Sequence, residues 1–64
     1  MSVGTVFRVK KEVLKNKPGV LGICYEDYKE GLSIIFENGK SDGFSPEDQD
    51  FILEKVGHLD GFHY

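Results

Sequence analysis

The chain has 64 residues, of which 39% are hydrophobic and 30% are charged, and its formal net charge at pH 7 is −3. This length allows one domain, spanning residues 1–64, and the composition argues against a disordered chain. No apolar run approaches the roughly 18 residues of a membrane-spanning helix. The single cysteine, Cys24, excludes an internal disulfide. Because the N-terminal segment also lacks the pattern of a secretory signal, we expect a cytoplasmic protein without a membrane partner.

The charges divide the chain into a basic and an acidic part. Residues 1–25 carry five cations and one acid, a net charge of +4. Residues 26–64 carry three cations and ten acids, a net charge of −7. A domain with such a dipole can steer a charged partner of either sign.

Residues 5–10 alternate between apolar and polar side chains, which predicts a half-buried first strand. Its expected inner face is Thr5, Phe7 and Val9. Residues 11–18 predict a long loop, because they are polar and basic and run into the turn signal Lys-Pro-Gly. We expect Val13 or Leu14 to tuck beneath this loop.

Three further strands are predicted in the middle of the chain. Residues 20–26 form the second strand, in which Gly22 indicates a bulge or a sharp bend where a side chain would obstruct. Residues 32–37 form the third, with an inner face of Leu32, Ile34 and Phe36. Asn-Gly at 38–39 predicts a type I′ hairpin turn, with positive φ at both positions, that leads into a returning strand over residues 40–44.

The C-terminal part begins with a predicted helix over residues 46–56. Ser45 can cap its start, a proline occupies its first position, and Gly57 can end it. The alternation around residues 51–53 also fits a strand, but the signals at both ends favour the helix. The aromatic tail, residues 58–64, predicts a short last strand that pairs with the first.

Short strands joined by tight turns favour a small curled antiparallel sheet or barrel with one short helix. Residues 18–22, 25–26, 34–39 and 42–45 resemble a pattern in small, largely uncharacterised bacterial and phage proteins that have an SH3-like barrel. The resemblance extends over residues 3–57. It implies an SH3-like domain and says almost nothing about function.

The residue types argue against catalysis and metal binding. Cys24 with His58 or His63 is the one formal nucleophile–base pair, but a cysteine within an apolar strand is typical of a core position. The two histidines and Asp60 lack the spacing of a tetrahedral metal site. We therefore predict a protein that is not an enzyme and has no metal and no cofactor.

A module that binds a protein partner is the favoured function. The resemblance implies a groove exposed near the turns, and aromatic residues are enriched at interface hot spots. The predicted partner-binding residues are Tyr25, Tyr28 and Phe44. Three other aromatic residues are assigned to the core: Phe7, Phe36 and Phe51. An open edge strand could also pair with a second copy of the chain and form a homodimer.

Two alternatives use the charged parts of the chain. A barrel that binds nucleic acid would use the basic segment 8–17, with contacts from Arg8, Lys10, Lys11, Lys15 and Lys17. The sequence pI of about 5.2 weighs against this alternative. An acidic inhibitor or decoy protein would instead present the predicted helix, with Glu47, Asp48, Asp50 and Glu54.

Overall fold

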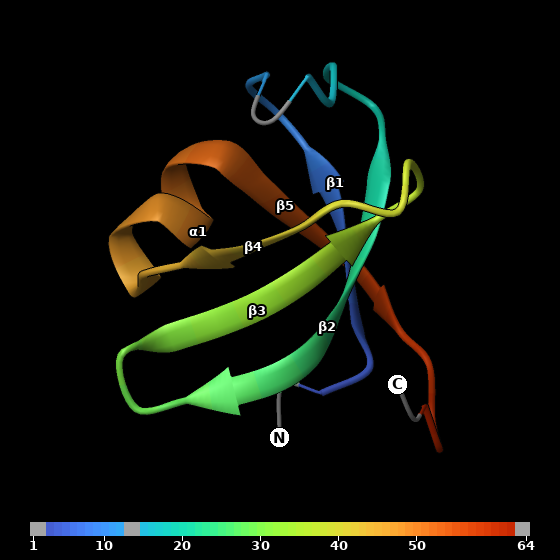
Figure 1. Cartoon of the computed structure of the whole chain (residues 1–64), viewed down its shortest axis with the longest axis vertical. Helices are drawn as coiled ribbons and strands as arrows, with labels where there is room; N and C mark the ends of the chain where they lie inside the picture. The colour runs from blue at the N-terminus through green and yellow to red at the C-terminus, as the bar shows by residue number, and fades with distance from the viewer. Residues whose placement is uncertain (1–2, 13–14, 63–64) are drawn as a thin grey trace.

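The structure is a computed structural model that describes residues 3–12 and 15–62. These residues form one strongly curved, antiparallel five-stranded sheet in the order β4-β3-β2-β1-β5 (Figure 1). The elements are β1 (Thr5–Val9), β2 (Leu21–Tyr28), β3 (Gly31–Phe36), β4 (Ser41–Phe44), α1 (Pro46–Ile52) and β5 (Leu53–His58). The sheet is not closed into a barrel, and β4 and β5 are its two edges. The prediction of a mainly β fold with one short helix is confirmed.

The inner face of the sheet carries the core, as the strand periodicity predicts. The buried apolar residues are Phe7, Val9, Cys24, Leu32, Ile34, Phe36, Phe44 and Leu53. Ile34 and Cys24 are completely buried, so the core position predicted for the cysteine is confirmed. The prediction for Phe51 was wrong: this ring is 61% exposed, and α1 has no buried residue.

The predicted irregularity in β2 lies further along the strand than expected. The register of β2 against β3 shifts between Cys24 and Glu26, and this shift makes Tyr25 the bulge residue. Gly22 itself pairs regularly, but a Cβ there would lie 2.7 Å from a methyl carbon of Ile34 and 2.8 Å from the ring of Phe36. The absence of a side chain therefore allows β2 to pack closely on the core.

The hairpin turn between β3 and β4 is not the predicted type I′ turn. Gly39 has a φ of 84°, whereas Asn38 is not among the described residues with positive φ. The Gly39 N–H donates to the Phe36 carbonyl, and the Phe36 N–H donates to the Lys40 carbonyl, both at 2.9 Å. This pattern is that of a three-residue loop with a glycine bulge, which also requires positive φ at the glycine alone.

The start of α1 agrees with the prediction, but its end does not. The Ser45 hydroxyl oxygen accepts a hydrogen bond from the Asp48 N–H at 3.3 Å, so the predicted N-cap is confirmed. The helix ends at Ile52 rather than residue 56, because Leu53 takes up extended backbone angles of φ −118° and ψ 151°. Gly57 is consequently a strand residue and not a helix C-cap.

The last strand consists of residues 53–58 rather than the predicted 58–64. It pairs with β1 from Val9 opposite Leu53 to Thr5 opposite His58. Pairing with β1 satisfies backbone groups that a longer helix would have had to satisfy within itself. Tertiary pairing therefore outweighs the local signals for a helix.

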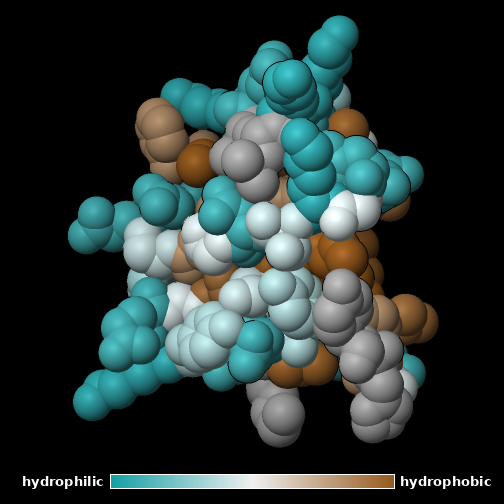
Figure 2. All heavy atoms as spheres, viewed as in Figure 1, coloured by the Kyte–Doolittle hydropathy of each residue, from teal (hydrophilic) through white to brown (hydrophobic). Residues whose placement is uncertain are grey.

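The segment that joins β1 to β2 lies at the upper end of the molecule in Figure 1. Hydrophilic side chains cover this end in Figure 2. Val13 and Leu14, which were expected to tuck beneath the loop, lie outside the described residues. Within residues 3–12 and 15–62, no helix has the length and apolar character that crossing a membrane requires.

Candidate interaction surface

Apolar side chains occupy the outer face of the sheet, where an antiparallel sheet with one packed face usually carries polar residues. Val6 of β1 lies opposite Ile23 of β2, and Ile23 lies opposite Ile35 of β3. The three side chains therefore form one row across three neighbouring strands. Leu21, two residues before Ile23 on the same face, is 40% exposed. These four residues are called the outer apolar row below.

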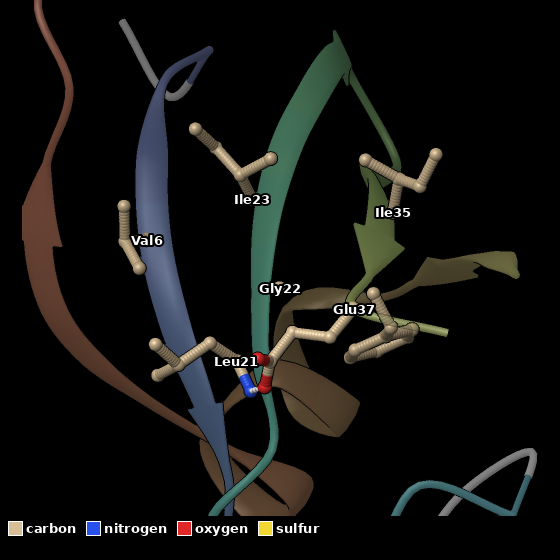
Figure 3. A pocket seen from close by; sticks show the side chains of 7 residues that line it. Val6, Leu21, Gly22, Ile23, Ile35 and Glu37 are labelled. Atoms are coloured by element: carbon tan, nitrogen blue, oxygen red, sulfur yellow. Dashed lines mark hydrogen bonds between the residues drawn. The ribbon is translucent and has the colours of Figure 1, made fainter. Parts of the chain in front are cut away.

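The outer apolar row borders an open hollow of about 240 Å³ (Figure 3). The residues that line the hollow are Val6, Leu21, Gly22, Ile23, Ile35, Phe36 and Glu37. Figure 3 shows the branched side chains of Val6, Ile23 and Ile35 projecting from adjacent strands on the same side of the sheet. The hollow can therefore accept an apolar side chain from outside the chain.

Glu37 lies at the margin of this hollow in a fixed position. Its N–H donates to the Leu21 carbonyl at 3.1 Å, and one of its carboxylate oxygens accepts from the Leu21 N–H at 2.7 Å (Figure 3). The side chain thereby continues the hydrogen bonding between β2 and β3 after the main chain has turned away into the hairpin. A negative charge is held next to apolar surface.

The predicted aromatic residues do not form one exposed set. Phe44 is 3% exposed, and its ring packs edge-on against Phe36 with 5.9 Å between the centroids. Its side chain belongs to the core. Tyr25 is half-buried at the bulge of β2. Tyr28 is 47% exposed and, together with Phe44, lines a second hollow of about 210 Å³.

Tyr28 is held by two hydrogen bonds at the end of β2. Its hydroxyl donates to a Glu26 carboxylate oxygen at 2.5 Å and accepts from the Ser33 hydroxyl at 3.3 Å. The hydrogen bond to Glu26 raises the pKa of Tyr28, because it favours the protonated phenol. The phenol therefore interacts with its own strand pair as well as with the solvent.

Three of the five cations predicted to bind nucleic acid contact residues of the acidic part of the chain, residues 26–64. Arg8 forms an ion pair with Glu54 at 2.9 Å. The Lys10 ammonium donates to the Asp50 carbonyl at 2.6 Å, and the Lys11 ammonium lies 3.6 Å from the centre of the Phe51 ring. The two remaining members, Lys15 and Lys17, are exposed in the loop before β2. The fold thus brings three of the five predicted cations onto α1 and β5.

The same contacts engage part of the predicted acidic set. Glu54 pairs with Arg8, and the backbone of Asp50 accepts from Lys10. Glu47 and Asp48 lie in the first turn of α1, where they complement the helix dipole. The charge division of the sequence is therefore partly neutralised where β1 meets β5 and α1.

Cys24 and His58, a formal nucleophile and base, each contact a different group. The Cys24 thiol donates to the Glu26 carbonyl at 3.3 Å, and its burial raises the pKa of the thiol. A ring nitrogen of His58 lies 3.4 Å from an Asp60 carboxylate oxygen, and His63 lies outside the described residues. The part of the chain that the structure describes holds no group of three or more histidine, cysteine or acidic side chains placed to bind a metal ion.

Both edge strands carry features that oppose pairing with another chain. The edge strand β4 has four residues, of which three are exposed. The edge strand β5 carries Lys55 and a register shift that makes Val56 a bulge residue. Short length, lysine and bulges are the means by which natural edge strands avoid further pairing. These features lie at the two edges of the sheet, whereas the outer apolar row lies on its face.

Comparison with protein-family models, with curated proteins and with solved structures found no match to this chain. One surface of the described residues combines the outer apolar row, the hollow that it borders, and the carboxylate at its margin.

The sequence reasoning did not select the outer apolar row. Part of the signal was in the strand alternation: Val6 and Ile35 each occupy the outward position of a predicted strand, where a polar residue is the rule. The second strand was predicted as an apolar run, so the sequence assigned no face to Ile23. One apolar residue on the outside of a strand is ordinary. The three residues form a row only when their strands are aligned in register.

Proposed function

We propose that the protein is a non-enzymatic interaction module that binds a segment of a protein partner on the outer face of β1, β2 and β3. The observation that carries this proposal is the outer apolar row and the open hollow beside it. Full burial of one aliphatic side chain contributes about 1.5–3 kcal/mol, so an apolar residue of the partner gains from entering the hollow. An SH3-like domain remains part of the proposal, supported by the strongly curved five-stranded sheet with its helix between β4 and β5.

The size of the apolar surface favours a partner segment over a second copy of the chain. Three strands about 4.8 Å apart, with two residues used along a strand, give a patch on the order of 200 Å². A stable interface between proteins buries about 800 Å² on each side. The outer apolar row is therefore large enough for one or two side chains but too small by itself to hold a homodimer.

The structure offers less support for the nucleic-acid hypothesis. A phosphate would compete with the Glu54 carboxylate for Arg8, while Lys10 and Lys11 lie against Asp50 and Phe51 of α1. Two exposed lysines, Lys15 and Lys17, would supply only a small electrostatic term, because nonspecific affinity grows with each neutralised phosphate.

The proposal is tested by a pull-down that compares three forms of the tagged protein in nuclease-treated and in untreated lysate. Ile23→Asp places a charge in the hollow. Asn38→Asp adds the same charge in the exposed hairpin turn, where its carboxylate can still accept the hydrogen bond from the Lys40 N–H. We expect a protein that the wild type and Asn38→Asp retain and that Ile23→Asp loses by about tenfold or more, which corresponds to 1.4 kcal/mol. Circular dichroism checks that each variant is folded.

Retention of the same proteins by folded Ile23→Asp would overturn the proposal, as would the absence of any protein that depends on Ile23. Loss of all retained material on nuclease treatment would favour the nucleic-acid hypothesis instead. Sedimentation velocity of the wild type is expected to show a monomer, and a dimer that Ile23→Asp dissociates would identify a second copy as the occupant of the hollow.

A further inference from the structure

Glu37 is the one charged residue among the described residues that line the hollow. The other lining side chains are aliphatic or aromatic, apart from one glycine. A ligand that fills the apolar part of the hollow therefore lies next to a single negative charge. This charge sets the electrostatic preference of the site.

The Glu37 carboxylate is positioned before any ligand arrives. One oxygen accepts from the Leu21 N–H at 2.7 Å, so the side chain need not be ordered on binding (Figure 3). A carboxylate offers about four acceptor positions over its two oxygens, and this contact uses one of them. The remaining positions suit the ammonium group of lysine or the forked donors of arginine.

Neighbouring charges on the outer face do not cancel Glu37. Arg8 lies opposite Leu21 in the register of β1 and β2 and is the nearest cation on this face by strand position. Its guanidinium makes two contacts with Glu54, at 2.9 and 3.0 Å, so Glu54 neutralises it. The chain as a whole has a net charge of −3, which adds to the attraction for a cation.

We infer that the partner segment carries a basic residue next to its apolar anchor, and that Glu37 recognises this residue while the outer apolar row holds the anchor. The inference rests on the proposed function. The ion pair lies at the exposed margin of the hollow, so its effect is a preference of about twofold to fivefold over a neutral segment. The apolar anchor provides most of the affinity.

The test is selection from a displayed library of random linear peptides against four immobilised forms of the full chain. Glu37→Gln removes the charge but keeps an amide oxygen that can accept from the Leu21 N–H. Glu37→Lys reverses the charge. Glu30→Lys makes the same change in the turn between β2 and β3, where Glu30 lines the second hollow and not the one beside the outer apolar row. The fourth form is the wild type.

We expect the wild type and Glu30→Lys to enrich peptides in which a large apolar residue lies within about three positions of lysine or arginine. Glu37→Gln should bind the selected peptides about twofold to fivefold more weakly, and Glu37→Lys should enrich acidic neighbours instead. Selection of the same basic peptides by Glu37→Lys would overturn the inference.

Counter-screening the selected peptides against Ile23→Asp separates this inference from the proposed function. Peptides that need Ile23 but show no charge preference would contradict the role of Glu37 and leave the proposed function standing. Peptides that bind equally well to Ile23→Asp, or a selection without enrichment, would contradict both.

Discussion

At Gly31 the first residue of β3 lies so close to the end of β4 that a side chain has no room. A Cβ built on Gly31 would lie 2.1 Å from the Phe44 carbonyl oxygen and 2.9 Å from the carbonyl carbon. Both atoms belong to the backbone, so a change of rotamer cannot relieve the overlap. The glycine is required by the close approach of two chain segments.

We predict that Gly31→Ala lowers the free energy of unfolding by more than about 2 kcal/mol, because β3 and β4 must move apart. Gly57→Ala is the matched control in β5: a Cβ there meets nothing within 4 Å, and the φ of Gly57 lies outside the region that disfavours a side chain. Its effect should stay within about 0.5 kcal/mol. Urea unfolding curves measure both, and equal effects of the two substitutions would contradict the close approach.

At the residue scale, the sequence predicted inward positions better than exposed ones. The alternation placed Phe7 and Phe36 in the core, and both are buried. Phe51 was predicted to lie in the core and is exposed. Phe44 was predicted to contact a partner, and its side chain is buried. An aromatic residue near a turn or in a short helix can face either way, and only the packing of neighbouring elements decides its exposure.

At the scale of single elements, β5 shows which backbone groups an edge strand leaves open. The Lys10 N–H donates to the Ile52 carbonyl at 2.6 Å, which marks a hydrogen-bonded pair between β1 and the start of β5. Hydrogen-bonded and non-hydrogen-bonded pairs alternate along an antiparallel ladder. Arg8 and Glu54 are therefore the next hydrogen-bonded pair, and the N–H of Lys55, opposite Phe7, points away from β1.

We predict that native-state hydrogen exchange distinguishes these neighbouring amides. The Glu54 amide should exchange about two orders of magnitude more slowly than the Lys55 amide, because only the first is held in the ladder. Exchange resolved by two-dimensional NMR measures both in one sample. Equal protection of the two amides would mean that another chain covers the free edge of β5, as in a homodimer formed through this edge.

The boundaries of the C-terminal elements could not be derived from local signals. Ser45 marks the start of α1 because a cap acts within one turn of the helix. The end of α1 depends on pairing between β1 and residues that lie more than 40 positions further along the chain. A glycine at position 57 is compatible with either outcome, so the sequence alone could not choose between a longer helix and a strand.

At the scale of the whole molecule, folding changes the meaning of the charge pattern. The basic and acidic parts look like two opposed surfaces in the sequence, yet β1 lies beside β5 and Arg8 pairs with Glu54. Two charged side chains that lie 46 positions apart in the chain therefore neutralise each other. This ion pair takes one cation from the predicted nucleic-acid-binding set and one carboxylate from the predicted decoy set.

The outer apolar row also depends on the whole molecule, because three strands contribute to it. Val6, Ile23 and Ile35 come from three strands and meet through the register of the sheet. The sequence predicted the three strands and the inner faces of the first and third. It could not align them, since register depends on the turns, the bulge at Tyr25 and the hairpin loop. The class of function, an interaction module, remains a proposal that this surface supports.

The most direct test of the proposed interaction surface is an NMR titration of the ¹⁵N-labelled chain with the peptide that the wild type enriches most strongly. We expect the largest amide shift changes at Val6, Ile23 and Ile35, with Glu37 among the perturbed residues. Shift changes centred on Tyr28, or on Lys15 and Lys17, with the outer apolar row unaffected, would contradict the account and move the binding site to one of the surfaces that the sequence first indicated.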